Sequence, residues 1–377
     1  MQHTAPNGTY TEEGDSSPRQ CPAGTYNLDS GQSVCPDCPE GYYCDLPGTS
    51  VLQQCPAGSY CPSGSDAPIP CPEGTFSSTA QLSNVTQCSP CTPGKYCDAA
   101  GLQTPTDDCL AGYFCAGGDD SATPVTVCPA GHYCQVGTHT PEPCPIGTFA
   151  AATDGKDVSH CQQCSGGKFC SSAGLSTPTG DCDGGWYCSG GASSSQPNDA
   201  TGDECTVGHQ CPAGSVAPVD CADGTYAATP GLATCTPCPE GNFCETPWIA
   251  PTPCPAGSYC TTNSGPDYPD CPAGTYSATG GKANLVDCQD CDANKYCAGP
   301  GNTAPTGDCE AGFECVAKCA DAQCSNADGT GGACPQGSFC LEGTPAQLCP
   351  VGTYGASSGY VDVFRSLSFW EFSDALD

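Results

Sequence analysis

The residues best able to carry out chemistry are the cysteines, which number 39 in a chain of 377 residues. Five pairs have the spacing Cys-x-x-Cys, a spacing that binds zinc or exchanges disulfides in other proteins. A zinc ribbon needs two such pairs about 15 to 20 residues apart, whereas successive pairs here lie at least 53 residues apart. A thioredoxin-type pair needs alternating strands and helices, which a chain with 49 Gly and 38 Pro does not provide. We therefore expect structural disulfides, no metal site and no cofactor; the pairs are Cys35/Cys38, Cys88/Cys91, Cys161/Cys164, Cys235/Cys238 and Cys288/Cys291.

Other reactive groups are sparse. The five histidines are scattered along the chain, and we expect no nucleophile, base and orienting acid to converge, so the chain is predicted not to be an enzyme. Paired acids offer an alternative cofactor, calcium, but they lack the spaced oxygen ligands of a calcium loop. A solvated acidic face is the preferred interpretation for these pairs, which are Asp107/Asp108, Asp119/Asp120 and Asp181/Asp183.

Composition places the chain among disulfide scaffolds. Leu, Ile, Val and Phe together number 41, too few for one large hydrophobic core. Disulfides compensate, because closing a loop of about 15 residues removes roughly 3 kcal/mol of unfolded-chain entropy per bridge. Disulfides persist in oxidising compartments, so we expect an extracellular protein, either secreted or at the cell surface.

Charge limits the partners. The chain has 41 acidic and 8 basic residues, a net charge of −33. It offers no basic surface to phosphates or anionic lipids, and no segment has the 18 or more apolar residues of a membrane span. We expect no nucleic-acid partner and no direct membrane insertion. The expected partners are copies of the same chain or other fibre proteins, together with glycans.

One short motif recurs through the chain: Cys, two residues, Gly, one residue, an aromatic, and often a second Cys. It occurs 19 times, and 13 copies carry the second cysteine. Gly is the third residue after the first Cys in 18 copies, and Asn294 replaces it in the other. Because Asn is the residue next most tolerant of left-handed geometry, this position is predicted to be a turn with positive φ. The aromatic is expected to lie over a disulfide or the next turn; Gln210 and Glu314 interrupt that pattern.

Six copies without the second cysteine open a block, and they divide the chain. The predicted segments are an N-terminal segment (1–20), block 1 (21–70), block 2 (71–143), block 3 (144–220), block 4 (221–270), block 5 (271–348) and an incomplete block with a divergent tail (349–377). Blocks 1 to 5 hold 6, 8, 8, 6 and 10 cysteines, all even numbers, as self-contained disulfide units require.

These patterns predict small disulfide-rich repeats: irregular, with short β-strands and almost no helix, arranged as an elongated tandem array or solenoid. Cys349 is left over, as a free thiol or a bridge to another chain, unless the sequence stops inside a repeat. The tail after it is a short docking helix or misread coding sequence. Met1 to Gln20 lacks the apolar stretch of a signal peptide, so we expect either a piece of a longer secreted protein or an incorrect start.

Two sequons predict N-linked glycans, at Asn7 and Asn84. Thr-Pro connectors recur just before a Cys and are candidates for O-linked sugars or for extended connectors. The candidate O-linked residues are Thr104, Thr106, Thr177, Thr179 and Thr306.

The pattern CPxGTY…CxxCPxGYYC, present between Cys21 and Tyr354, resembles the ephrin-receptor-like cysteine-rich repeat, itself akin to tumour-necrosis-factor-receptor and growth-factor-receptor modules. Such repeats serve as stalks, spacers and surface arrays. No ephrin-binding domain and no kinase domain accompanies them in this sequence, so kinase activity is not carried over.

The resemblance implies a disulfide pairing. Each opening cysteine would pair with the first Cys of its Cys-x-x-Cys: Cys21–Cys35, Cys71–Cys88, Cys144–Cys161, Cys221–Cys235 and Cys271–Cys288. The following links would interleave, for example Cys38–Cys55 and Cys44–Cys61. Pairing stays open in the longer blocks and at Cys319 and Cys324, an insertion present in one block only.

The first functional hypothesis is a structural subunit of an extracellular fibre, a flagellar hair of the mastigoneme type or a surface coat, because the chain is repetitive from end to end. The alternative hypothesis is the spacer or stalk of a cell-surface receptor or adhesin, which requires an anchor and a binding domain elsewhere.

Overall fold

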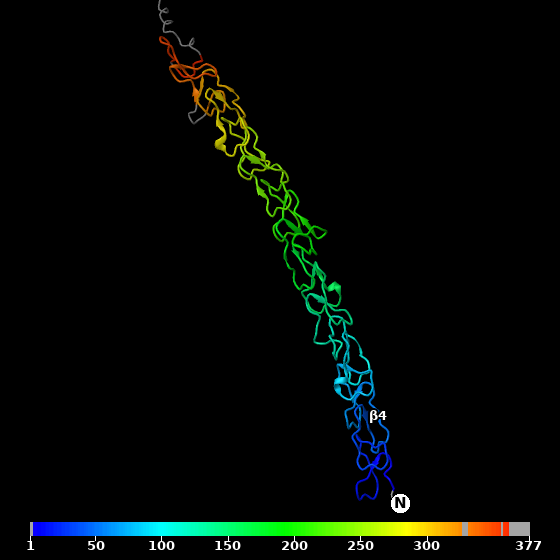
Figure 1. Cartoon of the computed structure of the whole chain (residues 1–377). Coiled ribbons are helices and arrows are strands. Elements are labelled where there is room, and N and C mark those ends of the chain that lie inside the picture. The colour runs from blue at the N-terminus through cyan, green and yellow to red at the C-terminus, as the bar shows by residue number, and fades with distance from the viewer. Residues whose placement is uncertain (1–2, 326–330, 356, 362–377) are drawn as a thin grey trace, which may run out of the picture. The chain divides into compact units, whose positions relative to one another are not determined.

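The computed structural model describes residues 3–325, 331–355 and 357–361. The chain divides into two compact units. Unit 1 comprises Met1–Asp181 and Ser189–Ser195, and unit 2 comprises Cys182–Cys188 and Gln196–Asp377. In each unit the elements are separate two-stranded antiparallel hairpins that follow one another in chain order (Figure 1). The fold class predicted from the sequence, small disulfide-rich repeats with almost no helix, is confirmed.

Unit 1 contains eight of these hairpins. They pair β1 (Thr9–Tyr10) with β2 (Arg19–Gln20), β3 (Tyr42–Tyr43) with β4 (Gln53–Gln54), β5 (Ser59–Tyr60) with β6 (Ile69–Pro70), β7 (Thr75–Phe76) with β8 (Ser89–Pro90), β9 (Lys95–Tyr96) with β10 (Asp107–Asp108), β11 (His132–Tyr133) with β12 (Glu142–Pro143), β13 (Thr148–Phe149) with β14 (Gln162–Gln163), and β15 (Lys168–Phe169) with β16 (Gly180–Asp181).

The described residues of unit 2 contain eight more. They pair β17 (Trp186–Cys188) with β18 (Gly202–Glu204), β19 (His209–Gln210) with β20 (Val219–Asp220), β21 (Thr225–Tyr226) with β22 (Thr236–Pro237), β23 (Asn242–Phe243) with β24 (Thr252–Pro253), β25 (Thr275–Tyr276) with β26 (Gln289–Asp290), β27 (Lys295–Tyr296) with β28 (Gly307–Asp308), β29 (Phe313–Cys315) with β30 (Gly331–Ala333), and β31 (Ser338–Phe339) with β32 (Gln347–Leu348).

Each hairpin from β3–β4 onward is built on one copy of the sequence motif, and we call the copy with its hairpin a rung. The first strand begins at the residue after the motif Gly or Asn and is two or three residues long, because Gly and Pro interrupt every longer run. Three further rungs form a single antiparallel bridge each: Thr25↔Asp37, Tyr113↔Val127 and Ser258↔Asp270. The helices within the described ranges are three 3-10 turns, η1 (Val85–Gln87), η2 (Val158–His160) and η3 (Leu285–Asp287).

Backbone hydrogen bonds join neighbouring rungs in a recurring pattern, which we call the ladder. The Gly41 amide donates to the Cys61 carbonyl of the next rung at 2.9 Å, and the Gly41 carbonyl accepts from the Cys55 amide at 2.9 Å. The connector after each rung also reaches back, as when the Gly64 amide donates to the Cys38 carbonyl at 2.8 Å. Polar backbone groups that the short strands leave unpaired are satisfied in this way.

At Gly131 the motif glycine meets two separate requirements. Its φ is +81°, and an added Cβ would lie 2.2 Å from the carbonyl oxygen of Gly174. Asn294, which replaces the glycine in one copy, has a φ of +68°. The positive-φ turn predicted from the sequence is therefore confirmed, and a close backbone approach is added to it.

The core consists of the disulfides themselves. All of the largest fully buried side chains among the described residues are cysteines. The motif aromatic packs on the disulfide of the following rung: Tyr60 lies against the cluster of Cys71, Leu82 and Cys88. Tyr296 lies in the same way against the four cysteines of a later cluster. The predicted contact between aromatic and disulfide is confirmed at these two rungs.

Sequence reasoning missed one rung, because it has no cysteines. Residues 5–20, assigned above to an N-terminal segment, form the β1–β2 hairpin and the same ladder, with the Gly31 amide donating to the Ala5 carbonyl at 2.8 Å. Ala5 and Thr11 occupy the places of the two cysteines, since APNGTYT aligns with CPAGSYC. Ala5 is 2% exposed. The signal available in the sequence was the Gly-Thr-Tyr triplet 16 residues before the one that follows Ala23.

A membrane span was also sought among the described residues. No helix there has the length and apolar character to cross a bilayer.

Candidate functional site

Nineteen disulfides connect the described cysteines. The five opening cysteines pair as the resemblance implies, over 14 or 17 residues: Cys21–Cys35, Cys71–Cys88, Cys144–Cys161, Cys221–Cys235 and Cys271–Cys288. These bonds each close a wide loop at the start of a block.

The interleaved pairing implied for the following cysteines is wrong. Cys38 pairs with Cys44 and Cys55 with Cys61, each within its own motif. The reason is the positive-φ turn between the two cysteines, which folds the chain back and leaves their Cα atoms 6.0 Å and 5.9 Å apart. That spacing lies in the ordinary range for a disulfide. Each motif with two cysteines is thus a closed rung.

The two cysteines of each Cys-x-x-Cys pair belong to different disulfides. In the first pair, Cys35 is bonded to the opening Cys21, while Cys38 is bonded forward to Cys44. The same division holds in the other four pairs. Each pair therefore links a wide loop to the rung that follows it.

Two cysteine features depart from the repeat. Cys349 has no disulfide partner and is partly exposed. Cys319 and Cys324, whose pairing the sequence left open, are bonded to each other. This bond lies beside Cys309–Cys315, and the sulfurs of Cys309, Cys315 and Cys319 are within 4.8 Å of one another. Within the described ranges these three form the one group of potential metal ligands, and all three sulfurs are held in disulfides.

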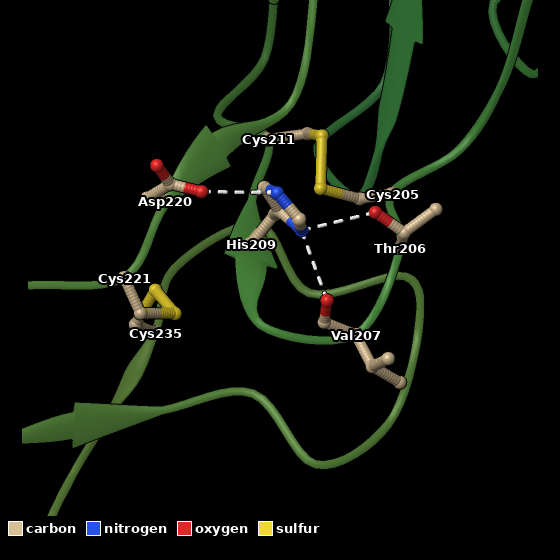
Figure 2. Close-up of polar contacts among 8 residues, drawn as sticks. All are labelled: Cys205, Thr206, Val207, His209, Cys211, Asp220, Cys221 and Cys235. Atoms are coloured by element: carbon tan, nitrogen blue, oxygen red, sulfur yellow. Dashed lines mark hydrogen bonds and ion pairs between the residues drawn. A yellow bond between two sulfur atoms is a disulfide. The ribbon is translucent and has the colours of Figure 1, made fainter. Parts of the chain in front are cut away.

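One histidine gathers a hydroxyl and a carboxylate around it, contrary to the expectation that no such groups converge. Figure 2 shows His209 at the start of β19, with Nε2 3.0 Å from Asp220 Oδ1 and Nδ1 3.0 Å from Thr206 Oγ1. Nδ1 also lies 2.9 Å from the Val207 carbonyl oxygen. The hairpin register places His209 opposite Asp220, which the sequence did not reveal because the two are 11 residues apart.

All of these contacts lie within one rung. Carbonyl and carboxylate oxygens only accept hydrogen bonds, so a His209 ring nitrogen acts as the donor wherever it bonds to Val207 or to Asp220. The Asp220 side chain is 89% exposed, and Thr206 lies in the rung turn. Gln210, which interrupts the aromatic pattern, accepts from the Cys235 amide at 3.1 Å. Polar contacts replace the missing aromatic contact at this rung.

Several of the paired acids make contacts within the chain. Asp108 and Asp181 form ion pairs with Lys95 and Lys168, each at 2.6 Å. Hydrogen bonding to Asp108 raises the pKa of Lys95 above its usual range. The ion pair recurs at the equivalent hairpin of block 5, between Lys295 and Asp308. Solvent-exposed pairs of this kind contribute little to stability.

The two sequons lie in different local structures. Asn84 is exposed and caps η1: its Oδ1 accepts from the Thr86 amide at 3.0 Å and from the Thr86 hydroxyl. Asn7 is exposed in the first rung, where the Thr9 hydroxyl donates to the Pro6 carbonyl at 2.6 Å. Both amide side chains are on the surface, as glycosylation requires.

The Thr-Pro connectors have a structural role. The hydroxyl of Thr179 accepts a hydrogen bond from the Ser171 amide at 3.0 Å, and the hydroxyl of Thr306 accepts one from the Ala298 amide at 2.8 Å. Thr106 donates to Asp98 at 2.6 Å in the equivalent loop. These hydroxyls close the turn after a rung, which accounts for their recurrence before a cysteine. Thr104 and Thr177 are exposed in the same connectors.

The geometry defines a protein of disulfide-bonded hairpin repeats. Each repeat is one closed rung, and the backbone hydrogen bonds of the ladder connect neighbouring rungs. Comparison with protein-family models and with curated proteins gave no match.

Proposed function

We propose that the chain is an extracellular structural protein: an elongated, disulfide-stapled repeat subunit of a fibre, of a flagellar hair or of a surface coat, carrying glycans. The single observation that carries this proposal is the backbone ladder, which repeats from rung to rung within each unit. A protein whose repeats bond only to their neighbours extends with each added repeat.

Oxidised cysteines support the extracellular location. Nineteen disulfides connect the described cysteines, and such bonds persist outside the reducing cytosol. A net charge of −33 keeps exposed surfaces soluble and mutually repelling. Assembly with copies of itself would therefore depend on local contacts or on cations that screen the charge.

Electron microscopy of native extracellular material that contains the protein tests this proposal. A filament whose axial repeat corresponds to a whole number of rungs is the expected result. Isolated rods tethered to membranes would instead favour the stalk of a receptor or adhesin. Solution scattering provides a second test. A compact globule of this length would have a radius of gyration of about 21 Å, and a measured value close to that would refute the elongated subunit.

A further inference from the structure

Four cysteines meet in the insertion of block 5. The rung disulfide Cys309–Cys315 and the inserted disulfide Cys319–Cys324 form one buried cluster, in which each cysteine is at most 2% exposed. The Sγ atoms of Cys309, Cys315 and Cys319 lie within 4.8 Å of one another. A sulfur at that distance needs only a small movement to attack a disulfide, which is the geometry of thiol–disulfide exchange.

The two partners of the inserted bond are held differently. The Cys319 carbonyl accepts the Cys297 amide at 2.8 Å, the same ladder contact that Asp119 makes with Cys97 at 2.9 Å. The backbone of Cys319 therefore stays beside the rung disulfide whether or not its own bond is intact.

Cys324 belongs to the inserted turn. Its amide donates to the Asp321 carbonyl at 3.1 Å, and its φ is +45°. Left-handed backbone is unfavourable at a residue other than Gly. Restoring it disfavours reformation of the Cys319–Cys324 bond once that bond has opened.

The equivalent rungs of the other long blocks provide an internal comparison. Cys109–Cys115 and Cys182–Cys188 have the same spacing and the same place in their blocks. Neither has an inserted cysteine pair beside it, as the sequence shows. Any exchange that depends on the neighbouring sulfur is thus confined to block 5.

We propose that this cluster is a thiol–disulfide exchange site: when local opening of the inserted turn exposes the buried Cys319–Cys324 bond, an external dithiol reduces it and the freed Cys319 then exchanges with the rung bond. A dithiol reduces Cys319–Cys324 with two electrons and two protons and leaves as a cyclic disulfide. The Cys319 thiolate then attacks Sγ of Cys309 or Cys315. A bond forms to the attacked sulfur, the Cys309–Cys315 bond breaks, and the displaced sulfur leaves as a thiolate that takes up a proton. This second step has no net oxidation.

The sharpest experiment removes Cys324 and so places a thiol at Cys319 without any reductant. The full chain carrying Cys324→Ser and Cys349→Ser is alkylated under native conditions, and the labelled cysteine is located by peptide mass mapping. We expect label on Cys309 and Cys315 within about tenfold of that on Cys319, because isomers within about 1.4 kcal/mol differ at most tenfold in population. Label on Cys319 alone would overturn the proposal.

Cys319→Ser in the same Cys349→Ser background is the matched control. It leaves a thiol at Cys324, whose sulfur is outside the group of three, so label is expected on Cys324 alone. Label scattered over Cys309 and Cys315 in this control would show unspecific scrambling and would overturn the proposal too.

A second measurement uses the unaltered chain, in case the variants misfold. Limiting dithiothreitol is added, and the reaction is quenched and mapped over time. Opening of Cys319–Cys324 is expected to be followed by a bond from Cys319 to Cys309 or Cys315. Loss of Cys109–Cys115 at the same rate as Cys309–Cys315 would refute a dedicated site. These readouts are independent of assembly into fibres, so the site and the proposed function fail separately.

Discussion

Replacement of Gly131 by alanine tests whether this motif glycine is required both for its φ and for a close backbone approach. Left-handed backbone costs an alanine about 1 to 2 kcal/mol. The added Cβ would lie 2.2 Å from the Gly174 carbonyl oxygen, closer than real contacts allow. Overpacking of that kind costs roughly 1 to 3 kcal/mol more. Gly131→Ala is therefore expected to lose about 2 to 5 kcal/mol of local stability.

Gly31 is the matched control. It has the same φ, +81°, but an added Cβ would meet nothing within 4 Å. Gly31→Ala should therefore lose only the conformational part, about 1 to 2 kcal/mol. Comparison of these two variants separates the close approach from the turn.

Amide hydrogen exchange is the appropriate assay, because a repeat array opens locally. The probe for the Gly131 variant is the Cys144 amide, which donates to the Gly131 carbonyl at 2.8 Å. The probe for the control is the amide of residue 31 itself, which donates to Ala5. Protection at the first probe is expected to fall at least about tenfold further than at the second, which corresponds to about 1.4 kcal/mol. Equal losses would refute the close-approach argument.

Three further predictions concern single features. Ala5→Cys with Thr11→Cys should form a disulfide in the cysteine-free rung and stabilise it by about 2 kcal/mol, from closure of a short loop; mass spectrometry that finds two free thiols would contradict the alignment of that rung. Hydrogen bonds from Ser325 lower the pKa of Asp321, so its carboxylate stabilises the inserted turn above the ordinary Asp pKa, and this stability is lost as pH falls through the lowered value. Exchange protection measured against pH should show that loss and should be flat for Asp321→Asn. Asn84→Asp should abolish an N-glycan while keeping the cap of η1, as Asp157 caps η2; an unchanged mass in material from the native source would mean that Asn84 carries none.

The inserted cysteine pair shows the limit of spacing arguments. An even number of cysteines in block 5 predicted that all ten could pair, yet spacing left the partners of Cys319 and Cys324 open. Backbone contacts decided them, because the ladder places Cys319 beside Cys297 and the turn at Asp321 returns the chain to it. The proximity of this pair to Cys309–Cys315 could not be predicted from the sequence for the same reason.

The sequence by itself determined the class of structure. Cysteine content, scarcity of large apolar residues and a repeated motif with a recurring glycine specify many small disulfide-bonded turns, since no other source of stability is present in the composition. The substitution of Asn294 for Gly already indicated the sign of φ. These are local properties, and local properties can be read from neighbouring residues.

Only the tertiary structure decided what joins one turn to the next. The contact of His209 with Asp220 and the cysteine-free rung at Ala5 depend on which backbone groups meet across strands and rungs, and the pairing of Cys38 with Cys44 depends on how far the turn between them folds the chain back. A rung with alanine in place of cysteine still forms there, because the ladder bonds use the main chain and not the sulfur. Cysteine spacing therefore shows where disulfides can form, while the hydrogen bonds of the backbone determine how neighbouring rungs are arranged.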